Sequence, residues 1–488
     1  MASSARPHET FGLAPLRQLA NQAFSRASGA PLREGNAIRL LIDAAENYPA
    51  WLEAIDAARE RISLEMYIVH GDAEGERFAE ALARKAREGV RVRVLYDWLG
   101  GFGKTSPFFW RPLRAAGAEV RVYNRPRLDQ PLGWLFRDHR KSIVVDDTVG
   151  FVTGLCIGKA WVGDPARGVE PWRDTGLEIR GPAVADLVDA FADSWAAVGE
   201  PLPDAERTSA APAPVGDVAL RVVAGTPNTA GLLRVDQLVA AMAQKTLWLT
   251  DAYYAGTTSY VQALRAAAAD GVDVRLLVPG ASDIPALGPI SRSGYRPLLE
   301  GGIRVFEWNG SMLHAKTAVA DGRWARVGST NLNIASWIGN RELDVVVEDA
   351  GFAGQMEEMF VADLERATEI VLDPRHRVRA PSASAPGLEP RPPASNVVSR
   401  HRSGGGSGGR VMSGAARIGS TVTAAMTNRR VLEAVEAHIA LMAGGLLALL
   451  AFLTWYYPRG IAYPIAVIAG WFAVALLIRG IIAVRQGR

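Results

Sequence analysis

The sequence predicts an α/β fold built from two halves related by pseudo-two-fold symmetry, followed by a C-terminal pair of apolar helices. Two observations predict the halves. The order of strands and helices repeats along the chain, and a His-x-Lys-x4-Asp motif occurs once in each repeat. A third observation predicts the apolar pair, because residues 439–457 and 461–478 carry no charged side chain.

Strands and helices alternate in the same order in both repeats, which predicts a parallel or mixed sheet in each. Each repeat begins with an alternating strand, continues through a helical stretch, and returns to a second and a third strand. The expected pairs are strands 62–69 and 247–254, helices 77–88 and 260–270, strands 89–96 and 271–278, and strands 118–123 and 303–306.

Composition sets the expected boundaries between the parts of the chain. Pro, Ala and Ser between residues 201 and 217 suggest the connection between the halves, and Pro, Ser, Gly and Arg dominate the stretch that follows the second half. The expected parts are an N-terminal segment 1–36, a first half 37–205, a second half 217–373, a disordered basic linker 374–430 and a transmembrane hairpin 431–488.

Charge is distributed unevenly along the chain. Residues 374–430 contain ten arginines and one glutamate, and residues 431–488 contain four arginines and two glutamates. Because the whole chain has a net charge of +3, residues 1–373 carry a net charge of −8. A nucleic-acid-binding body is usually basic, and we therefore expect no nucleic-acid partner. The linker arginines suit either contact with anionic lipid headgroups or simple solubility.

The two apolar runs predict an antiparallel pair of membrane-spanning helices. Each run of 18 or 19 residues reaches roughly the thickness of a bilayer core as a helix. Residues 458–460 would form the turn between them. Arginines flank the outer ends of the pair more densely than the turn, which predicts a C-terminal anchor in the inner (cytoplasmic) membrane with the body in the cytoplasm.

The strongest chemical signal is the repeated motif. His139, Lys141 and Asp146 form its first copy, and His314, Lys316 and Asp321 form its second. A strand and a glycine turn follow each copy, at residues 151–156 and 326–331, and the two blocks align without a gap. If each motif lies in a strand, its histidine and lysine, two residues apart, share one face.

Two facing His/Lys pairs provide what a phosphodiester reaction requires: a nucleophile, a proton donor for the leaving oxygen, and cations for the anionic oxygens. The other five histidines show no metal-ligand spacing. We therefore expect neither a metal nor another cofactor.

Two His-x-Lys-x4-Asp motifs, the second followed by Gly-Ser-x-Asn, resemble the signature of the phospholipase D superfamily, which includes cardiolipin synthases, phospholipases D and some nucleases. The resemblance covers residues 37–370. It implies a covalent phosphohistidine, assigned to His139, and proton donation by His314, although the pseudo-symmetry permits either order. The resemblance also implies two other roles. Lys141, Lys316, Ser329 and Asn331 would bind phosphate oxygens, and Asp174 and Glu342 would orient the histidines. Asp146 and Asp321 end the expected motif strands, which predicts a structural role in holding a turn.

One position departs from the family pattern. The family usually has Gly-Gly-x-Asn after its first motif, whereas this chain has Thr153, Gly154, Leu155 and Cys156. The thiol at residue 156 suits either a small buried residue at a tolerant position or a changed substrate pocket with reduced activity.

The resemblance favours a phosphatidyltransferase similar to cardiolipin synthase, with phospholipid as substrate and the membrane as its site of action. A phospholipase D that uses water is the first alternative, and a membrane scaffold without activity is the second. Complete His/Lys pairs in both halves disfavour the scaffold. Water and lipid hydroxyl attack the same intermediate, so the sequence leaves the acceptor, the headgroup and the oligomeric state open.

Overall fold

A computed structural model describes residues 13–126, 136–207, 211–284, 287–372, 429–431, 445 and 448–486. Its first half contains strands β1 (Arg33–Ile42), β2 (Arg61–Met66), β3 (Arg91–Asp97), β4 (Glu119–Tyr123), β5 (Lys141–Val145), β6 (Val149–Thr153) and β7 (Thr175–Arg180). Its helices are α2 (Asp43–Ala57), α3 (Ala73–Arg87), α4 (Trp98–Gly101), η1 (Pro107–Trp110), α5 (Arg111–Ala115), α6 (Lys159–Val162), η3 (Pro165–Arg167), α7 (Val184–Ala196) and α8 (Asp204–Arg207).

The second half repeats this order. Its strands are β8 (Val218–Gly225), β9 (Thr246–Thr250), β10 (Asp273–Pro279), β11 (Arg304–Trp308), β12 (Thr317–Ala320), β13 (Trp324–Gly328), β14 (Glu342–Val347) and β15 (Ala367–Val371). Its helices are α9 (Gly231–Met242), α10 (Thr258–Ala269), α11 (Leu287–Ser293), α12 (Tyr295–Glu300), η4 (Ala335–Gly339) and α13 (Ala350–Glu365).

The two halves have equivalent sheets. The strand order is β1-β7-β6-β5-β2-β3-β4 in the first half, and β8-β14-β13-β12-β9-β10-β11 in the second. Strands β2–β3–β4 and β9–β10–β11 are parallel, whereas the other pairs within these sets are antiparallel. The predicted α/β class, with a mixed sheet in each half, is confirmed.

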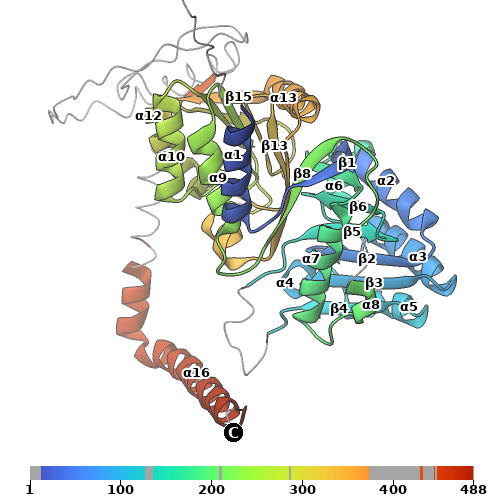
Figure 1. The fold of residues 1–488 in the computed structure, drawn as a ribbon. Coiled ribbons are helices and arrows are strands. Elements are labelled where there is room, and N and C mark those ends of the chain that lie inside the picture. The colour runs from blue at the N-terminus through green and yellow to red at the C-terminus, as the bar shows by residue number, and fades with distance from the viewer. Residues whose placement is uncertain are drawn as a thin grey trace, which may run out of the picture.

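The halves join along β1 and β8, which pair antiparallel and make one continuous ladder of strands. A shared apolar core also connects them, because Val152 and Leu177 of the first half cluster with Val327 and Leu343 of the second. Figure 1 shows the two sheets side by side, with β8 passing between them. This arrangement brings the ends of β5, β7, β12 and β14 toward one another.

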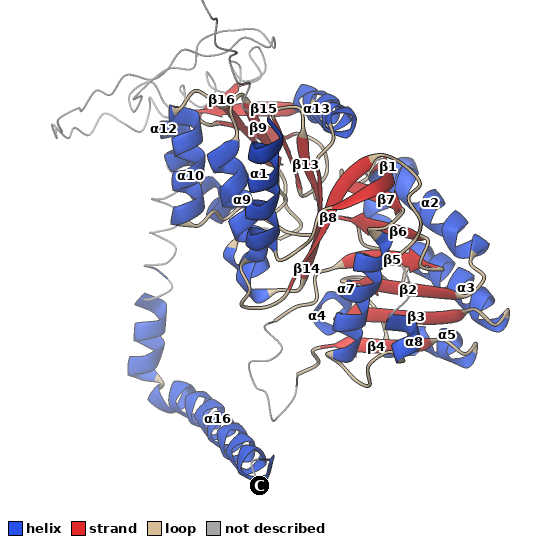
Figure 2. Cartoon of the chain, viewed as in Figure 1, coloured by secondary structure: helices blue, strands red, loops and turns tan. Residues whose placement is uncertain are grey.

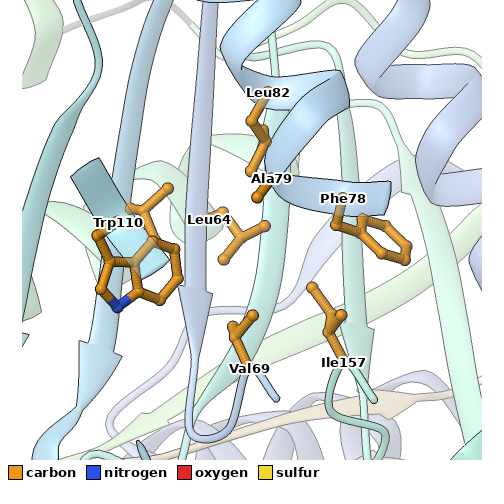
Figure 3. A pocket seen from close by; sticks show the side chains of 8 residues that line it. Leu64, Val69, Phe78, Ala79, Leu82, Trp110 and Ile157 are labelled. Atoms are coloured by element: carbon orange, nitrogen blue, oxygen red, sulfur yellow. The ribbon is translucent and has the colours of Figure 1, made fainter. Parts of the chain in front are cut away.

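Local sequence explains where the elements begin. Helix α3 starts after Asp72, whose Oδ1 accepts a hydrogen bond from the Gly75 amide at 3.1 Å, as an N-cap residue does. Phe78 and Leu82, four residues apart, are buried on the face that packs against the sheet. Figure 3 shows both side chains beside Leu64 of β2.

The N-terminal helix belongs to the core of the second half. Helix α1 (Leu13–Ser28) packs against α9, and Phe24 and Ala30 are buried in the same apolar cluster as Val235. Strand β1 then begins at Arg33 and enters the first half. The segment before the first half therefore contacts the opposite half.

The C-terminal region differs from the predicted hairpin. Tyr457 separates a helix at residues 448–456 from helix α16 (Pro458–Gln486). Residues 458–460, which were predicted to form the turn, therefore begin a helix instead. Proline lacks an amide hydrogen and is well tolerated in a first helical turn. Figure 2 shows the two helices meeting end to end at an open angle, not packed antiparallel.

No helix among the described residues is both long and apolar enough to cross a membrane. Part of the first predicted run, residues 439–444, 446 and 447, lies outside the described residues, as do residues 374–428 of the predicted linker. The end of that linker is not disordered. Strand β16 (Arg429–Val431) pairs in parallel with the edge strand β15.

Candidate active site

Both motif histidines lie in extended segments immediately before a strand, not in the strand itself. Strand β5 begins at Lys141 and β12 begins at Thr317. The His139 amide donates to the Arg341 carbonyl at 2.9 Å, and the His314 amide donates to the Arg173 carbonyl at 2.7 Å. The expected strand placement is wrong, because each histidine backbone pairs with the opposite half.

Each histidine also takes its carboxylate partner from the opposite half. His139 Nδ1 lies 2.9 Å from Glu342 Oε2, and His314 Nδ1 lies 2.7 Å from Asp174 Oδ2. All four residues are buried. The structure therefore brings together the two histidines and the two acids in crossed pairs, so that neither half holds a complete pair alone.

Further hydrogen bonds fix both carboxylates. The Ser329 hydroxyl donates to Glu342 Oε2 at 2.5 Å, and Asn340 Nδ2 donates to Glu342 Oε1 at 3.1 Å. Trp161 Nε1 donates to Asp174 Oδ2 at 3.1 Å. A carboxylate held in this way sets the orientation and tautomer of the imidazole that it contacts.

Electrostatics favour a neutral imidazole beside an ionised carboxylate in both pairs. Burial lowers the pKa of His139, and the nearby Lys141 lowers it further, while Glu342 opposes the shift. Burial alone would raise the pKa of Glu342, but the interactions with His139 and Lys141 lower it overall. The Nδ1 proton of His139 then faces Glu342 and leaves the Nε2 lone pair free.

The second pair shows the same directions. Burial and Lys316 lower the pKa of His314 to about 4, against the opposing effect of Asp174. The pKa of Asp174 is lowered because His314 and Lys316 outweigh its burial. Burial also lowers the pKa of Lys316 to about 8. Each histidine is thus a neutral base.

The two lysines lie beside the histidines and face aromatic rings. Lys141 Nζ donates to the His139 carbonyl at 2.5 Å and lies 5.3 Å from the centre of the Tyr67 ring. Lys316 Nζ donates to the His314 carbonyl and lies 5.8 Å from the Tyr253 ring. Each ammonium group is therefore fixed next to its imidazole and has donors left for an anion.

The two residues expected to bind phosphate occupy different places. Ser329 is fully buried, and its hydroxyl bonds Glu342 and the Leu343 amide, so it positions the carboxylate instead of facing substrate. Asn331 is also buried, but its Oδ1 has no hydrogen-bond partner among the described residues. Of Ser329 and Asn331, it is thus Asn331 whose side chain can still form a hydrogen bond with a ligand.

Comparison with known proteins decides the family. A family model described as "Cardiolipin synthase, PLD-like domain" matches residues 51–163 and 239–364, which contain both motifs. Cardiolipin synthase A of Pseudomonas aeruginosa is 34% identical over 370 residues, which are 73% of each chain. Cardiolipin synthase of Halalkalibacterium halodurans is 33% identical over 362 residues, 72% of this chain and 71% of that protein. The chain belongs to the cardiolipin synthase-like phospholipase D superfamily.

A solved structure supports the fold of this phospholipase D family member. The crystal structure of phosphatidylserine synthase from Haemophilus influenzae superimposes with a TM-score of 0.57 and 16% sequence identity. The match covers 72% of this chain and 91% of that chain.

The two aspartates that close the phospholipase D motifs lie in turns outside the His/Lys cluster. Asp146 accepts hydrogen bonds of 2.8 Å from three successive amides, residues 59–61, that lead into β2. Asp321 does the same for residues 244–246, which lead into β9. Both aspartates have positive φ angles, near 50°, as expected for turn positions.

Cys156, the departure from the family pattern, lies in the buried segment after β6, where its carbonyl accepts a hydrogen bond from the Tyr48 hydroxyl at 2.7 Å. Its thiol is buried, and burial raises its pKa although Lys141 opposes the shift. Lys316 also lowers the pKa of this thiol, which places Cys156 within the field of both lysines. A neutral thiol here offers an anionic substrate only a weak donor.

Sequence reasoning missed the aromatic walls of the site. The Tyr67 ring lies 4.8 Å from the His139 ring, and the Tyr253 ring lies 5.8 Å from the His314 ring. Trp161 and Trp172 each lie 5.7 Å from His314. The tyrosines were detectable, since each follows the first strand of its repeat. Trp161 lies in the short helix α6 and Trp172 in the irregular stretch before β7, outside the blocks of sequence that the repeat aligned.

Sequence reasoning also missed Arg140, the residue between the first histidine and lysine. Its buried guanidinium donates to the Glu342 carbonyl at 3.1 Å and to the Gly225 carbonyl at 2.9 Å, both in the second half. The corresponding residue of the second motif is Ala315.

In the part of the chain that the structure describes, no group of three or more potential ligands could hold a metal ion.

Proposed function

We propose that this chain is a phosphatidyltransferase that exchanges the headgroup of one phospholipid for the hydroxyl of another through a phosphohistidine. The observation that carries the proposal is the pair of crossed His–carboxylate contacts, each with a lysine two residues on. The curated relatives named cardiolipin synthase support a phospholipid as substrate.

In the proposed first step, the phosphodiester lies between the two lysines. His139 Nε2 attacks phosphorus, and the bond from phosphorus to the headgroup oxygen breaks. His314 supplies the proton that this oxygen needs to leave as an alcohol. The two ammonium groups lower the pKa values of both imidazoles, and the negative charge of a bound phosphodiester would offset this effect. Substrate binding thus favours protonation of His314.

The second step reverses these roles. Neutral His314 removes the proton of the acceptor hydroxyl, whose oxygen attacks phosphorus as the bond to His139 breaks. Glu342 keeps the Nδ1 proton of His139 in place, so that Nε2 returns as a neutral base. With phosphatidylglycerol as donor and acceptor, the products are cardiolipin and glycerol.

The direct test supplies phosphatidylglycerol vesicles to the purified full-length protein and measures the products. We expect more cardiolipin and glycerol than phosphatidic acid. If phosphatidic acid predominates with abundant lipid acceptor, water is the acceptor and the protein is a hydrolase. If no product forms while the protein is folded, the transferase and the hydrolase proposals both fail.

A phosphatidyl ester of an acidic phenol tests the assignment of the two histidines, because its leaving group needs no proton. His314→Ala should still release one equivalent of the phenol and accumulate a covalent lipid on His139. His139→Ala should release none. The opposite pattern would reverse the assignment.

We also propose that the C-terminal region attaches the body to the cytoplasmic face of a membrane. Trp455, Tyr456 and Val467 expose their apolar surfaces in the described helices, as does Tyr457 between them, and the basic residues flank the outer ends of the apolar runs. Deleting residues 432–488, which leaves β16 intact, should shift the protein from the membrane fraction to the supernatant. An unchanged distribution would contradict this mode of attachment.

A further inference from the structure

Large apolar side chains are exposed in the segment that follows β3. Phe102 and Phe108 are 66% and 62% exposed, and Leu99 is 37% exposed. Phenylalanine at such exposure is unfavourable in water unless another surface covers it. The catalytic mechanism uses none of the three.

The exposed rings belong to an ordered segment. Asp97 caps α4 by accepting from the Leu99 amide at 2.8 Å, and Trp110 at the other end is 2% exposed and stacks on Tyr96. Figure 3 shows Trp110 beside the apolar side chains of β2 and α3. The segment is thus anchored at both ends while Phe102 and Phe108 point outward.

The same segment packs on the residues that follow β2, which include Tyr67 of the active site. Thr105 donates its hydroxyl hydrogen to the Val69 carbonyl, and the Lys104 carbonyl accepts from the Gly71 amide at 3.1 Å. Gly100 lies so close to the Tyr67 carbonyl that a Cβ atom would clash with it. Because Tyr67 contacts His139, the exposed rings lie at the rim of the site.

The second half places apolar residues at the equivalent position. Ile284 and Ile290 follow β10, the counterpart of β3, and are 44% and 48% exposed. The Tyr253 hydroxyl donates to Asp283, the neighbour of Ile284, at 2.7 Å. Ile334 is 54% exposed, and the preceding Asn333 donates to the Tyr253 carbonyl at 2.9 Å. Both tyrosines of the site are therefore bordered by exposed apolar residues.

Charge indicates what covers the first-half side of this rim. Residues 98–118 contain no acidic residue, although residues 1–373 have a net charge of −8. Lys104 and Arg111 are exposed there, and the Arg111 guanidinium lies 4.1 Å from the centre of the Phe108 ring. Exposed aromatic rings beside cations match the interface of a bilayer with anionic headgroups.

We infer that Leu99, Phe102, Phe108, Ile284, Ile290 and Ile334 form a lipid-docking rim that seats the active site on an anionic bilayer. The inference rests on the proposed phospholipid function, and it assigns to the body a second membrane contact besides the C-terminal helices. The rim would bring lipid headgroups to the site while its apolar residues exclude water from the entrance.

One experiment measures contact with lipid directly. Full-length Phe102→Cys carries an environment-sensitive dye. Val215→Cys, at an exposed apolar position beside Gly35 and outside the proposed rim, is the matched control. Cys156 is buried, which favours labelling at the introduced site. In vesicles of phosphatidylglycerol and phosphatidylcholine, nitroxide lipids should quench the dye at residue 102 several-fold more than at residue 215. Equal quenching at the two positions would overturn the inference.

A second experiment separates docking from catalysis. Phe102→Ser with Phe108→Ser should lower turnover on vesicles roughly tenfold and leave turnover on dispersed short-chain phosphatidylglycerol within about twofold. Val361→Ser, also at an exposed apolar position, should change neither. An equal loss on both substrates, or no loss on vesicles, would contradict a docking role. Lipid quenching without any phosphatidyl transfer would instead retain the rim and reject the proposed function.

Discussion

The two halves hold their carboxylates by different means at equivalent positions. In the second half the Ser329 hydroxyl bonds Glu342, whereas the first half has Gly154 at the matching place. A Cβ at Gly154 would collide with Asp174 Oδ1, so the absence of a side chain makes room for that carboxylate. The halves therefore reach a similar His–carboxylate geometry in different ways. The second half uses the Ser329 hydroxyl to hold Glu342, and the first half uses the missing side chain of Gly154 to make room for Asp174.

The surroundings of the two histidines differ as well. His314 is bordered by Trp161, Trp172 and Tyr253, whereas Tyr67 is the aromatic neighbour found beside His139 among the described residues. The two positions at which the family resemblance predicts a phosphate contact also differ, with Asn331 on one side and Cys156 on the other. A repeated fold thus provides two similar bases, and unequal neighbours give them the opportunity for separate roles.

The largest expected effect tests whether both histidines are required. His139→Ala and His314→Ala should each lower turnover of a natural phospholipid by about 10⁴-fold or more, and the double variant should be little worse, because the two act in one covalent mechanism. Turnover is measured on phosphatidylglycerol vesicles, with thermal unfolding as the control for folding. Near-normal turnover by either variant would remove the need for two histidines.

The next effect tests the crossed carboxylates. Glu342→Gln and Asp174→Asn keep the size of each side chain but remove its charge, and roughly 10²- to 10⁴-fold losses in turnover are expected, as for other carboxylates that orient a catalytic histidine. On the phosphatidyl ester of an acidic phenol, Glu342→Gln should impair the release of the phenol, and Asp174→Asn should spare it. Equal effects on this substrate would mean that the carboxylates do not serve separate histidines.

A third prediction uses the difference between Gly154 and Ser329. Gly154→Ala pushes Asp174 away from His314, and a misplacement of about 1 Å costs roughly 10²-fold in turnover. Ser329→Ala removes one hydrogen bond to Glu342 and should cost about tenfold. Turnover of both variants is measured on the same vesicles to show which substitution costs more activity. Melting temperatures control for a loss of folding. A larger loss for Ser329→Ala would contradict the steric argument.

A fourth prediction concerns pH. The pKa of Lys316 is lowered to about 8 by burial, so its positive charge is present below that pH and is lost above it. Phosphate binding should weaken accordingly, and kcat/KM for dispersed substrate should fall above about pH 8. Lys316→Arg, which stays charged, should show lower activity without this alkaline decline. A flat profile for the unaltered protein would reject this role for Lys316.

The smallest effect compares Asn331 with Cys156. Asn331→Ala removes an amide with hydrogen-bonding capacity to spare, and KM should rise about tenfold, whereas Cys156→Ala replaces a weak donor and should change KM by less than about threefold. Steady-state kinetics on dispersed phosphatidylglycerol provide the measurement. If Cys156→Ala has the greater effect, the thiol contributes to substrate binding.

Much of the fold follows from the sequence because its periodicity is local. Alternation and turn residues predicted the repeated strands, and the observed β3 at Arg91–Asp97 lies within about two residues of the expected 89–96. The repeated motif with its constant spacing also identified the His/Lys pairs. These features depend on neighbours along the chain.

Tertiary structure decided how the repeats complete one another. The family resemblance suggested Asp174 and Glu342 as partners of the histidines but did not state which acid meets which histidine. The crossed pairing arises because β1 and β8 join the sheets and because Arg341 and Arg173 accept hydrogen bonds from the histidine backbones of the opposite half. The role of Ser329 changed for the same reason, since its hydroxyl lies beside the carboxylate that pairs across the interface. A contact between residues 203 apart, such as that of His139 with Glu342, depends on how the sheets associate, and local periodicity carries no information about that association.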